Sequence, residues 1–157
     1  MGIHLYLTPH ERNPMITVQK TISWDMGHRL PYHDHKCRNP HGHRYELDLF
    51  LTGPVCQISQ NPKEGMLIDF TDLSQIMKDC IYKPFDHCFI FDKKDRIMSS
   101  FYTLNPDFKH IAVDFVPTAE NLVVYCYERL SPQIKAPLKI EKLILRESPH
   151  SSATYTP

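Results

Sequence analysis

The sequence predicts an α+β domain that combines an antiparallel sheet with two helices. Apolar and polar residues alternate in three segments, near residues 16–24, 41–52 and 138–147, as is typical of half-buried strands. Two segments between them, residues 73–81 and 119–130, instead repeat apolar residues with the period of an amphipathic helix. Because the strands gather at both ends of the chain and the helices lie between them, we expect an antiparallel α+β arrangement rather than a parallel doubly wound one.

Length and composition indicate a single globular domain. The chain has 157 residues, of which 41% are hydrophobic and 23% charged, and this gives enough apolar surface for a core. The 18 basic and 18 acidic residues balance, whereas proteins that bind nucleic acid or anionic membranes usually carry a basic excess. No apolar run approaches the ~20 residues of a membrane-spanning helix. We therefore expect one domain over residues 15–157 that binds neither nucleic acid nor membranes.

The N-terminal segment and the cysteines bear on the cellular compartment. Residues 1–14 lack the basic start and the apolar stretch of a signal peptide, and we expect them to form an extension ahead of the domain. The five cysteines include no C-x-x-C pair, which argues against a disulfide framework and for a reducing compartment. The sequence therefore predicts a cytoplasmic protein.

The first two strands follow from the alternation of apolar and polar residues. In the first strand, one parity is apolar except at Lys20, and it comprises Ile16, Val18, Ile22 and Trp24. A loop that contains histidines and prolines follows over residues 27–40. Residues 41–52 alternate again, and Gly53-Pro54 ends this second strand. Its apolar side comprises Tyr45, Leu47, Leu49 and Leu51.

An apolar stripe with helical spacing indicates the first helix. The stripe comprises Leu73, Ile76, Met77, Cys80 and Ile81. Asp69 or Thr71 can act as the N-cap, because either side chain can accept a hydrogen bond from a free N–H group of the first turn. We expect Pro84 to end the helix, since proline lacks an N–H group and does not continue the hydrogen-bond pattern.

The second half of the chain begins with a long, mostly polar connection over residues 88–116. The pattern of residues in this connection does not predict a definite structure, and either a short helix or a mobile lid is compatible with it. A second helix begins after Thr118, a good N-cap, and ends at Ser131-Pro132. Its buried stripe comprises Ala119, Leu122, Val123, Cys126, Tyr127 and Leu130. The last alternating segment places Leu143, Leu145 and Glu147 on one face, and a short strand is expected near Tyr155.

The ten histidines are unevenly distributed, and five of them lie between His28 and His43. His41 and His43 are two residues apart on a predicted strand, so their rings project from the same apolar face as Tyr45. Burying two imidazoles there is costly unless they are coordinated or hydrogen-bonded. A third imidazole would complete a site with an open fourth position, which is the arrangement of catalytic zinc. The candidates for the third are His28, His33 and His35.

The residues alone leave other interpretations open. His41 and His43 could equally be a pair of core histidines, and the Cys37 thiolate could be a metal ligand. Asp86-His87 could be a surface pair, although the apolar run after it places the dipeptide where an aspartate can raise the basicity of an imidazole. Glu147 could be a solvated residue at a strand end, or a carboxylate that accepts paired N–H donors from a ligand.

Six short motifs occur in order along the chain. They are Trp24-Asp25-Met26-Gly27-His28-Arg29-Leu30, Cys37-x3-His41-Gly42-His43-x-Tyr45, Gly65-Met66-x-Ile68-Asp69-Phe70, Asp86-His87, Pro117-Thr118-Ala119-Glu120-Asn121 and Glu147-Ser148. Together they resemble the 6-pyruvoyltetrahydropterin and 6-carboxytetrahydropterin synthase family over about residues 15–156. The resemblance implies a tunnelling-fold subunit, with a four-stranded antiparallel sheet and two helices on one face. It also implies a homo-oligomer in which three subunits close a barrel, two barrels stack as a hexamer, and active sites form between subunits.

The resemblance also implies roles for individual residues. The implied zinc ligands are His28, His41 and His43. The implied catalytic residues are Cys37, Asp86, His87 and Glu147. Glu147 would also anchor the pterin ring, and Thr118, which is explained as a helix cap, would be a secondary pterin contact. His33 and His35 remain without a role. Arg29, Lys36 and Arg38 are placed where they could hold a triphosphate. They could equally be basic residues that are simply solvated at the surface.

The implied activity is a zinc-dependent lyase reaction on 7,8-dihydroneopterin triphosphate. The spacing Cys37-x3-His41-Gly42-His43 is similar to that of the bacterial 6-carboxytetrahydropterin synthases of the queuosine and 7-deazaguanine route. Those enzymes form 6-carboxy-5,6,7,8-tetrahydropterin and release acetaldehyde and triphosphate. The alternatives are 6-pyruvoyltetrahydropterin synthase activity and a zinc- or pterin-binding member without turnover. The long segment after His87 leaves the side-chain preference open.

Overall fold

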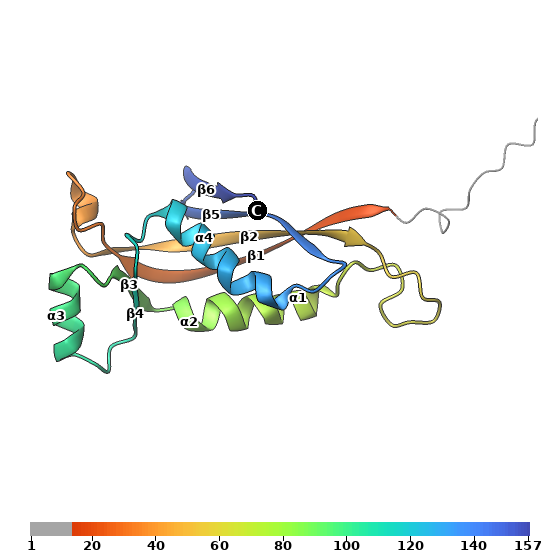
Figure 1. Ribbon diagram of the computed structural model, residues 1–157, viewed down its shortest axis with the longest axis horizontal. Coiled ribbons are helices and arrows are strands. Elements are labelled where there is room, and N and C mark those ends of the chain that lie inside the picture. Colours follow the sequence, from red (N-terminus) through yellow and green to blue (C-terminus); the bar gives the residue numbers. More distant parts are fainter. Residues whose placement is uncertain (1–13) are drawn as a thin grey trace, which may run out of the picture.

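One mixed sheet is the framework of the computed structural model, which describes residues 14–157 (Figure 1). The six strands of this region are β1 (Met15–His28), β2 (His41–Pro54), β3 (Cys88–Asp92), β4 (His110–Val113), β5 (Lys139–Ser148) and β6 (Ser151–Tyr155), in the order β4-β3-β1-β2-β5-β6. The pairs β1–β2, β2–β5 and β5–β6 are antiparallel, whereas β3 is parallel to both β1 and β4. The α+β class is confirmed, but the expectation of four strands, all antiparallel, is wrong. Apart from Pro14, the predicted N-terminal extension lies outside the described residues.

The connection 88–116 differs most from the sequence-based expectation, because it contains two strands and a helix. Strand β3 adds to the last three residues of β1, and β4 then pairs with β3. Between them, α3 (Arg96–Leu104) begins at Asp95, whose Oδ1 accepts hydrogen bonds from the backbone N–H groups of Ile97 and Met98. The strands were not predicted because β3 is a short, continuous apolar run, and a run of this length shows no alternation.

The first helical segment consists of α1 (Phe70–Met77), a π-helical turn (Lys78–Tyr82) and α2 (Lys83–Phe85). Asp69 is its N-cap, because Asp69 Oδ1 accepts a 2.7 Å hydrogen bond from the N–H of Thr71. The helical segment ends at Phe85, one residue after Pro84, so the predicted end is confirmed to within one residue. A proline leaves the carbonyl four residues earlier without its helical donor. That carbonyl belongs to Cys80, and Arg129 Nε donates to it at 2.8 Å, which replaces the missing bond.

The second helix matches its prediction. Helix α4 (Ala119–Leu130) begins at Thr118, whose hydroxyl oxygen accepts a hydrogen bond from the N–H of Asn121. Helices α1 and α4 lie on the same side of the sheet (Figure 1). Between them and the sheet lies the main core, which includes the fully buried side chains of Leu47, Leu49, Leu51, Leu73, Met77, Leu122 and Leu130. Burial of each such side chain stabilises the fold by about 1.5–3 kcal/mol.

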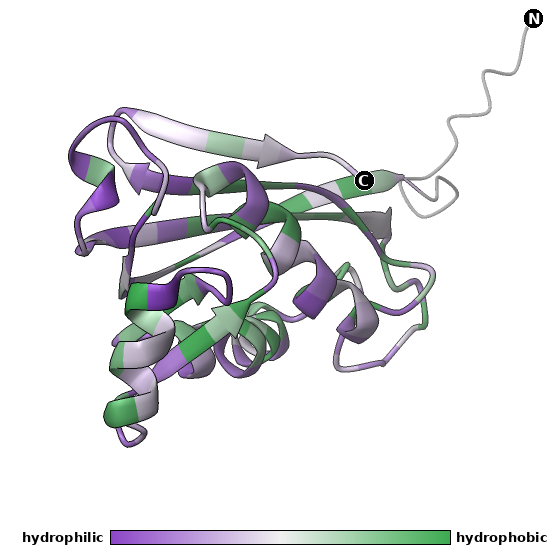
Figure 2. Ribbon diagram, turned by 60° about the vertical axis from the view of Figure 1, so that its left-hand side comes forward, coloured by the Kyte–Doolittle hydropathy of each residue, from purple (hydrophilic) through white to green (hydrophobic). Residues whose placement is uncertain are grey.

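Alternation along β2 decides which side chains face the helices. Its odd-numbered residues from Tyr45 to Leu51 are completely buried, and the even-numbered positions lie on the other face. Figure 2 shows hydrophobic and hydrophilic positions following one another along the strands. His41 and His43 share the parity of Tyr45, so they lie at the end of the helix-covered face. None of the helices in residues 14–157 is long and apolar enough to cross a membrane.

Candidate functional site

Three histidines meet where β1 ends and β2 begins. In the antiparallel register, His28 lies opposite His41, and Met26 lies opposite His43. The nitrogen ligand atoms of His28, His41 and His43 all lie within 4.8 Å of one another. Cross-strand neighbours on one face of a sheet have closely spaced Cβ atoms, which explains why two strands suffice to assemble the group. His28 is thus the third imidazole of the cluster, while His33 and His35 lie against each other in the loop, with ring centroids 5.8 Å apart.

Main-chain carbonyls orient two of these imidazoles. The Nδ1 atom of His28 lies 2.7 Å from the Pro117 carbonyl oxygen, and that of His41 lies 2.8 Å from the Asn39 carbonyl oxygen. Since a carbonyl only accepts, each ring carries its proton on Nδ1 and leaves the lone pair of Nε2 free. Among the described residues, the buried Nε2 of His28 has no hydrogen-bond partner. Such outer hydrogen bonds are typical of metal-binding histidines.

Burial keeps the cluster in the form that binds metal. The side chain of His28 is almost completely buried, and this burial lowers the pKa of His28 to about 4. Burial also lowers the pKa of His43, although Glu147 opposes the effect. At neutral pH both rings are therefore uncharged, as coordination requires. The donor set and the unpartnered Nε2 atom fit a zinc ion with an open coordination position.

Glu147 lies beside the histidines. It is the penultimate residue of β5, and its Oε1 atom accepts a 3.2 Å hydrogen bond from the Tyr45 hydroxyl. The same oxygen lies 3.8 Å from His28 Nε2, and only 22% of the Glu147 side chain is exposed. Burial, followed by the charge of Glu147, raises the pKa of Tyr45, so the phenol stays protonated and remains a donor. Tyr45 was predicted only as a core residue, although its parity with His41 and His43 could have indicated this contact.

Six of the predicted site residues line one cavity of about 370 Å³. They are His28, Cys37, His41, His43, Thr118 and Glu147. Cys37 lies in a short 3₁₀ turn (Lys36–Arg38), and its carbonyl accepts a 2.9 Å hydrogen bond from the N–H of Leu30, which folds the loop back over the strand ends. The group of close ligand atoms contains the three imidazoles and not the Cys37 thiol. The cavity can therefore hold a metal ion with a separate thiol at its wall.

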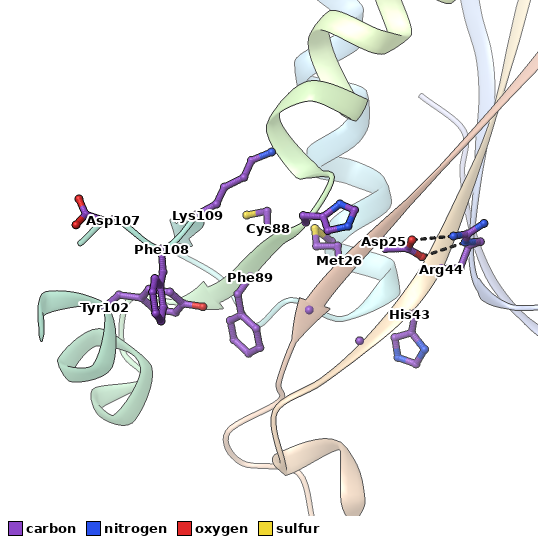
Figure 3. Close-up of a pocket in the computed structure, with 13 residues that line it drawn as sticks. Asp25, Met26, His43, Arg44, Cys88, Phe89, Tyr102, Asp107, Phe108 and Lys109 are labelled. Atoms are coloured by element: carbon purple, nitrogen blue, oxygen red, sulfur yellow. Dashed lines mark hydrogen bonds and ion pairs between the residues drawn. The ribbon is translucent and has the colours of Figure 1, made fainter. Parts of the chain in front are cut away.

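The Asp86–His87 pair does not line this cavity. His87 lines a second cavity, of about 800 Å³, whose wall also includes Asp25, Arg44 and Phe89 (Figure 3). Its wall combines Arg44, at an even-numbered position of β2, with Met26 and His43, which have the parity of the helix-covered face, so this cavity lies over the neighbouring ends of β1, β2 and β3. His43 borders both cavities. Within one chain, the structure therefore separates the pair from Cys37.

The pair itself has a defined geometry. Asp86 Oδ2 lies 2.9 Å from His87 Nδ1, and Asp86 Oδ1 accepts a hydrogen bond from the N–H of Asp25 at 3.3 Å. Burial raises the pKa of Asp86, but the hydrogen bonds from His87 and Asp25 outweigh it, so the pKa lies below its usual range. An ionised Asp86 favours the tautomer of His87 with the proton on Nδ1. Because 77% of the His87 side chain is exposed, its Nε2 atom is available to an external group.

The structure also places the three candidates for a triphosphate contact. Arg29 is buried and forms a 2.9 Å ion pair with Asp95, so it joins the loop after β1 to the first turn of α3. Lys36 and Arg38 are exposed on the 3₁₀ turn beside Cys37. Of the three, only Lys36 and Arg38 lie where an anion could reach them.

Comparisons with known proteins agree with the fold. The 6-carboxy-5,6,7,8-tetrahydropterin synthase of Haemophilus influenzae is 36% identical over 143 residues, which cover 90% of this chain and 99% of that protein. The structure of Caenorhabditis elegans 6-pyruvoyl tetrahydropterin synthase matches with a TM-score of 0.66 at 26% identity, covering 93% of this chain and 98% of that one. A crystal structure of a Wolinella succinogenes protein matches with a TM-score of 0.74 at 22% identity, covering 91% and 98%.

These matches confirm the tunnelling-fold class, with two strands more than expected. The sequence model of the 6-pyruvoyl tetrahydropterin synthase family covers residues 17–157. The chain therefore belongs to the 6-pyruvoyl tetrahydropterin synthase family.

Proposed function

We propose that the protein is a zinc-dependent lyase that converts 7,8-dihydroneopterin triphosphate into 6-carboxy-5,6,7,8-tetrahydropterin, with release of acetaldehyde and triphosphate. One observation supports this most strongly: three imidazoles, a thiol and a carboxylate line a single cavity. The name of the Haemophilus influenzae relative supports the carboxylated product. We place this reaction in queuosine and 7-deazaguanine biosynthesis.

His28, His41 and His43 would hold the zinc ion, which would act as a Lewis acid toward the side-chain hydroxyls of the substrate. Cys37 would remove a carbon-bound proton as a thiolate. Glu147 would accept hydrogen bonds from the aminopyrimidine edge of the pterin and so fix the ring in the cavity. Thr118 lies at the same wall and would add a secondary contact.

The Asp86–His87 pair would move protons to and from the substrate side chain. His87 lines the second cavity and not the histidine cavity of its own chain, so we propose that it serves the histidine cavity of a neighbouring protomer. Asp86 would hold the imidazole in one tautomer while Nε2 exchanges protons with the substrate. Each active site would then contain residues from more than one subunit.

An oligomer also accounts for the edges of the sheet. Among the described residues, β3 pairs with only Met26–His28 of β1, which leaves Met15–Asp25 without a strand on that side, and β6 is the strand at the opposite edge. Exposed edges of this length are usually covered, and pairing of unlike edges around a symmetry axis closes a ring. We propose a trimer or a hexamer of identical subunits.

Light scattering of the purified protein tests the assembly. We expect a mass of three or six times 18.4 kDa, and turnover only in that fraction. A stable monomer with full activity would contradict the shared site as well as the ring.

Substitution of Glu147 by glutamine tests the role of the carboxylate. Glutamine has nearly the same shape but offers a neutral acceptor, and hydrogen bonds to a charged group are worth about 1.5–3 kcal/mol. We expect the Kd for a pterin to rise roughly 10- to 100-fold, measured by calorimetry, while the zinc content stays constant. Glu120→Gln, at the wall of the same cavity, is the control and should leave the Kd unchanged. An unchanged Kd in Glu147→Gln would remove Glu147 from the pterin site.

Product analysis tests the reaction itself. The zinc-loaded protein is incubated with 7,8-dihydroneopterin triphosphate, and the products are identified by mass spectrometry with trapping of aldehydes. We expect 6-carboxy-5,6,7,8-tetrahydropterin and acetaldehyde. A pyruvoyl side chain on the product would establish the alternative that the Caenorhabditis elegans similarity favours. Pterin binding without turnover would identify a non-catalytic member.

A further inference from the structure

The peptide unit that joins Asp86 to His87 is held in an unusual conformation. His87 has a φ of 56°, in the left-handed region that residues with side chains rarely adopt. Such a conformation costs free energy and persists only where the surrounding structure determines it. The conformation matters here because it sets the direction in which the exposed imidazole leaves the turn.

Both polar atoms of this peptide unit have a partner from a distant part of the chain. The N–H of His87 donates to the Asp25 carbonyl at 2.8 Å. The carbonyl oxygen of Asp86 accepts a 2.6 Å hydrogen bond from Lys109 Nζ. Rotation of a peptide unit changes the ψ of the residue before it and the φ of the residue after it. Fixing both its oxygen and its N–H therefore fixes the φ of His87.

Lys109 makes a second bond at the same helix end. Its Nζ atom also donates to the Lys83 carbonyl at 2.8 Å, within the last turn of α2. Both acceptors are main-chain oxygens at a helix C-terminus, where a positive charge is favourable. Figure 3 shows the Lys109 side chain reaching away from Asp107 and Phe108 toward the end of that helix. Lys109 immediately precedes β4, and its own carbonyl accepts a 3.2 Å hydrogen bond from the N–H of Phe89.

We infer that Lys109 is a positioning residue for the Asp86–His87 pair: its ammonium group fixes the peptide unit between them and so directs the His87 imidazole toward the substrate. That Lys109 fixes the peptide unit follows from the hydrogen bonds alone. That this directs His87 in catalysis rests on the proposed function. Other charged or titratable groups around the pair are Asp25, Tyr82 and Arg44. The N–H of Asp25 and the side chain of Tyr82 bond to the Asp86 carboxylate, whereas Arg44 pairs with the Asp25 carboxylate. The segment 88–116 would thus help to position the Asp86–His87 pair, which directly precedes it in the chain.

Substitution of Lys109 by methionine tests the inference, because methionine keeps the length of the side chain and removes the donor. A misplacement of about 1 Å in a catalytic group can cost ~10²-fold in rate. We expect kcat to fall about 10- to 100-fold, with KM and zinc content unchanged. The amide of His87 should exchange its hydrogen faster, as measured by hydrogen–deuterium exchange. Lys109→Arg, which can donate to both carbonyls, should restore most of kcat.

Lys93→Met is the matched control. Lys93 lies in the same segment and forms an exposed 2.9 Å ion pair with Asp114, away from the pair. It should leave kcat and the exchange rate of the His87 amide unchanged. If Lys109→Met does not fold, Lys109→Gln takes its place, since it retains one donor group, and it should give an intermediate kcat.

Unchanged kcat, an effect on KM alone, or an unchanged exchange rate at the His87 amide would each overturn the inference. The inference would also be overturned if Lys109→Arg had as low a kcat as Lys109→Met and both variants lost thermal stability and zinc together. That result would mean that Lys109 supports the fold in general and does not position His87. Absence of turnover in the unchanged protein would refute the proposed function only, and the exchange of the His87 amide would still decide whether Lys109 holds the turn.

Discussion

Replacing Cys37 by alanine is expected to lower kcat by about 10²- to 10⁴-fold, the usual contribution of a general base. This corresponds to about 3–5 kcal/mol of transition-state stabilisation. The zinc content should stay constant, because the cluster of ligand atoms consists of three imidazoles and does not include the thiol. KM should change little, since Glu147 and the metal site remain in place.

Steady-state kinetics and metal analysis of the same preparation measure both effects. Cys56→Ala is the matched control, because Cys56 is a partly buried cysteine in the loop beyond the other end of β2. It should behave as the unchanged protein does. Loss of zinc in Cys37→Ala would make the sulfur a ligand, and full turnover would transfer the role of the base to His87.

Replacing His41 by alanine should remove most of the zinc and, with it, turnover. Changes to residues that only orient a metal ligand typically cost ~10- to 100-fold in metal affinity, so the loss of a ligand should cost more. Only two of the three imidazoles of the cluster would remain. One of them is His28, whose Nε2 atom has no hydrogen-bond partner among the described residues. Elemental analysis after dialysis against a weak chelator measures the effect.

The loop histidines supply the control for this experiment. His35→Ala should keep its zinc, because His35 lies against His33 and outside the cluster. Far-ultraviolet circular dichroism should show the same secondary structure in both variants. A His41→Ala protein that retains zinc through dialysis would disprove the assignment of the ligands.

Local patterns in the sequence were sufficient for most of the fold. Alternation predicted β1, β2 and β5, because each of these strands has one face against the helices and one face away from them. Helical spacing and hydrogen-bonding caps predicted the two main helices. Thr118 was the expected cap of α4, and Asp69 is the one of two candidates, Asp69 and Thr71, that caps α1. The same parity rule placed His41 and His43 on one face, since residues two apart on a strand cannot point in opposite directions.

The positions of β3 and β4 depended on partners that are distant in the chain. Strand β3 is parallel to β1 and lies beside residues that precede it by about 60 positions, so no local pattern could indicate the pairing. Pro84 shows how a distant partner completes a local signal. The proline predicts the end of the helix, which lies one residue later at Phe85, and the Cys80 carbonyl that it leaves without a helical donor accepts a hydrogen bond from the Arg129 side chain of α4.

For the site, too, the sequence predicted one part and the tertiary structure decided the other. The residue types and the family motifs predicted which side chains would carry the chemistry, because a metal site needs imidazoles and proton transfer needs a thiol or a histidine. Only the tertiary structure decided how they are grouped. The register of β1 against β2 brings His28 to His41 and His43 and leaves His33 and His35 in the loop. His87 and Cys37 line different cavities, because Cys37 lies in the loop between β1 and β2 whereas His87 lies in the turn that leads into β3.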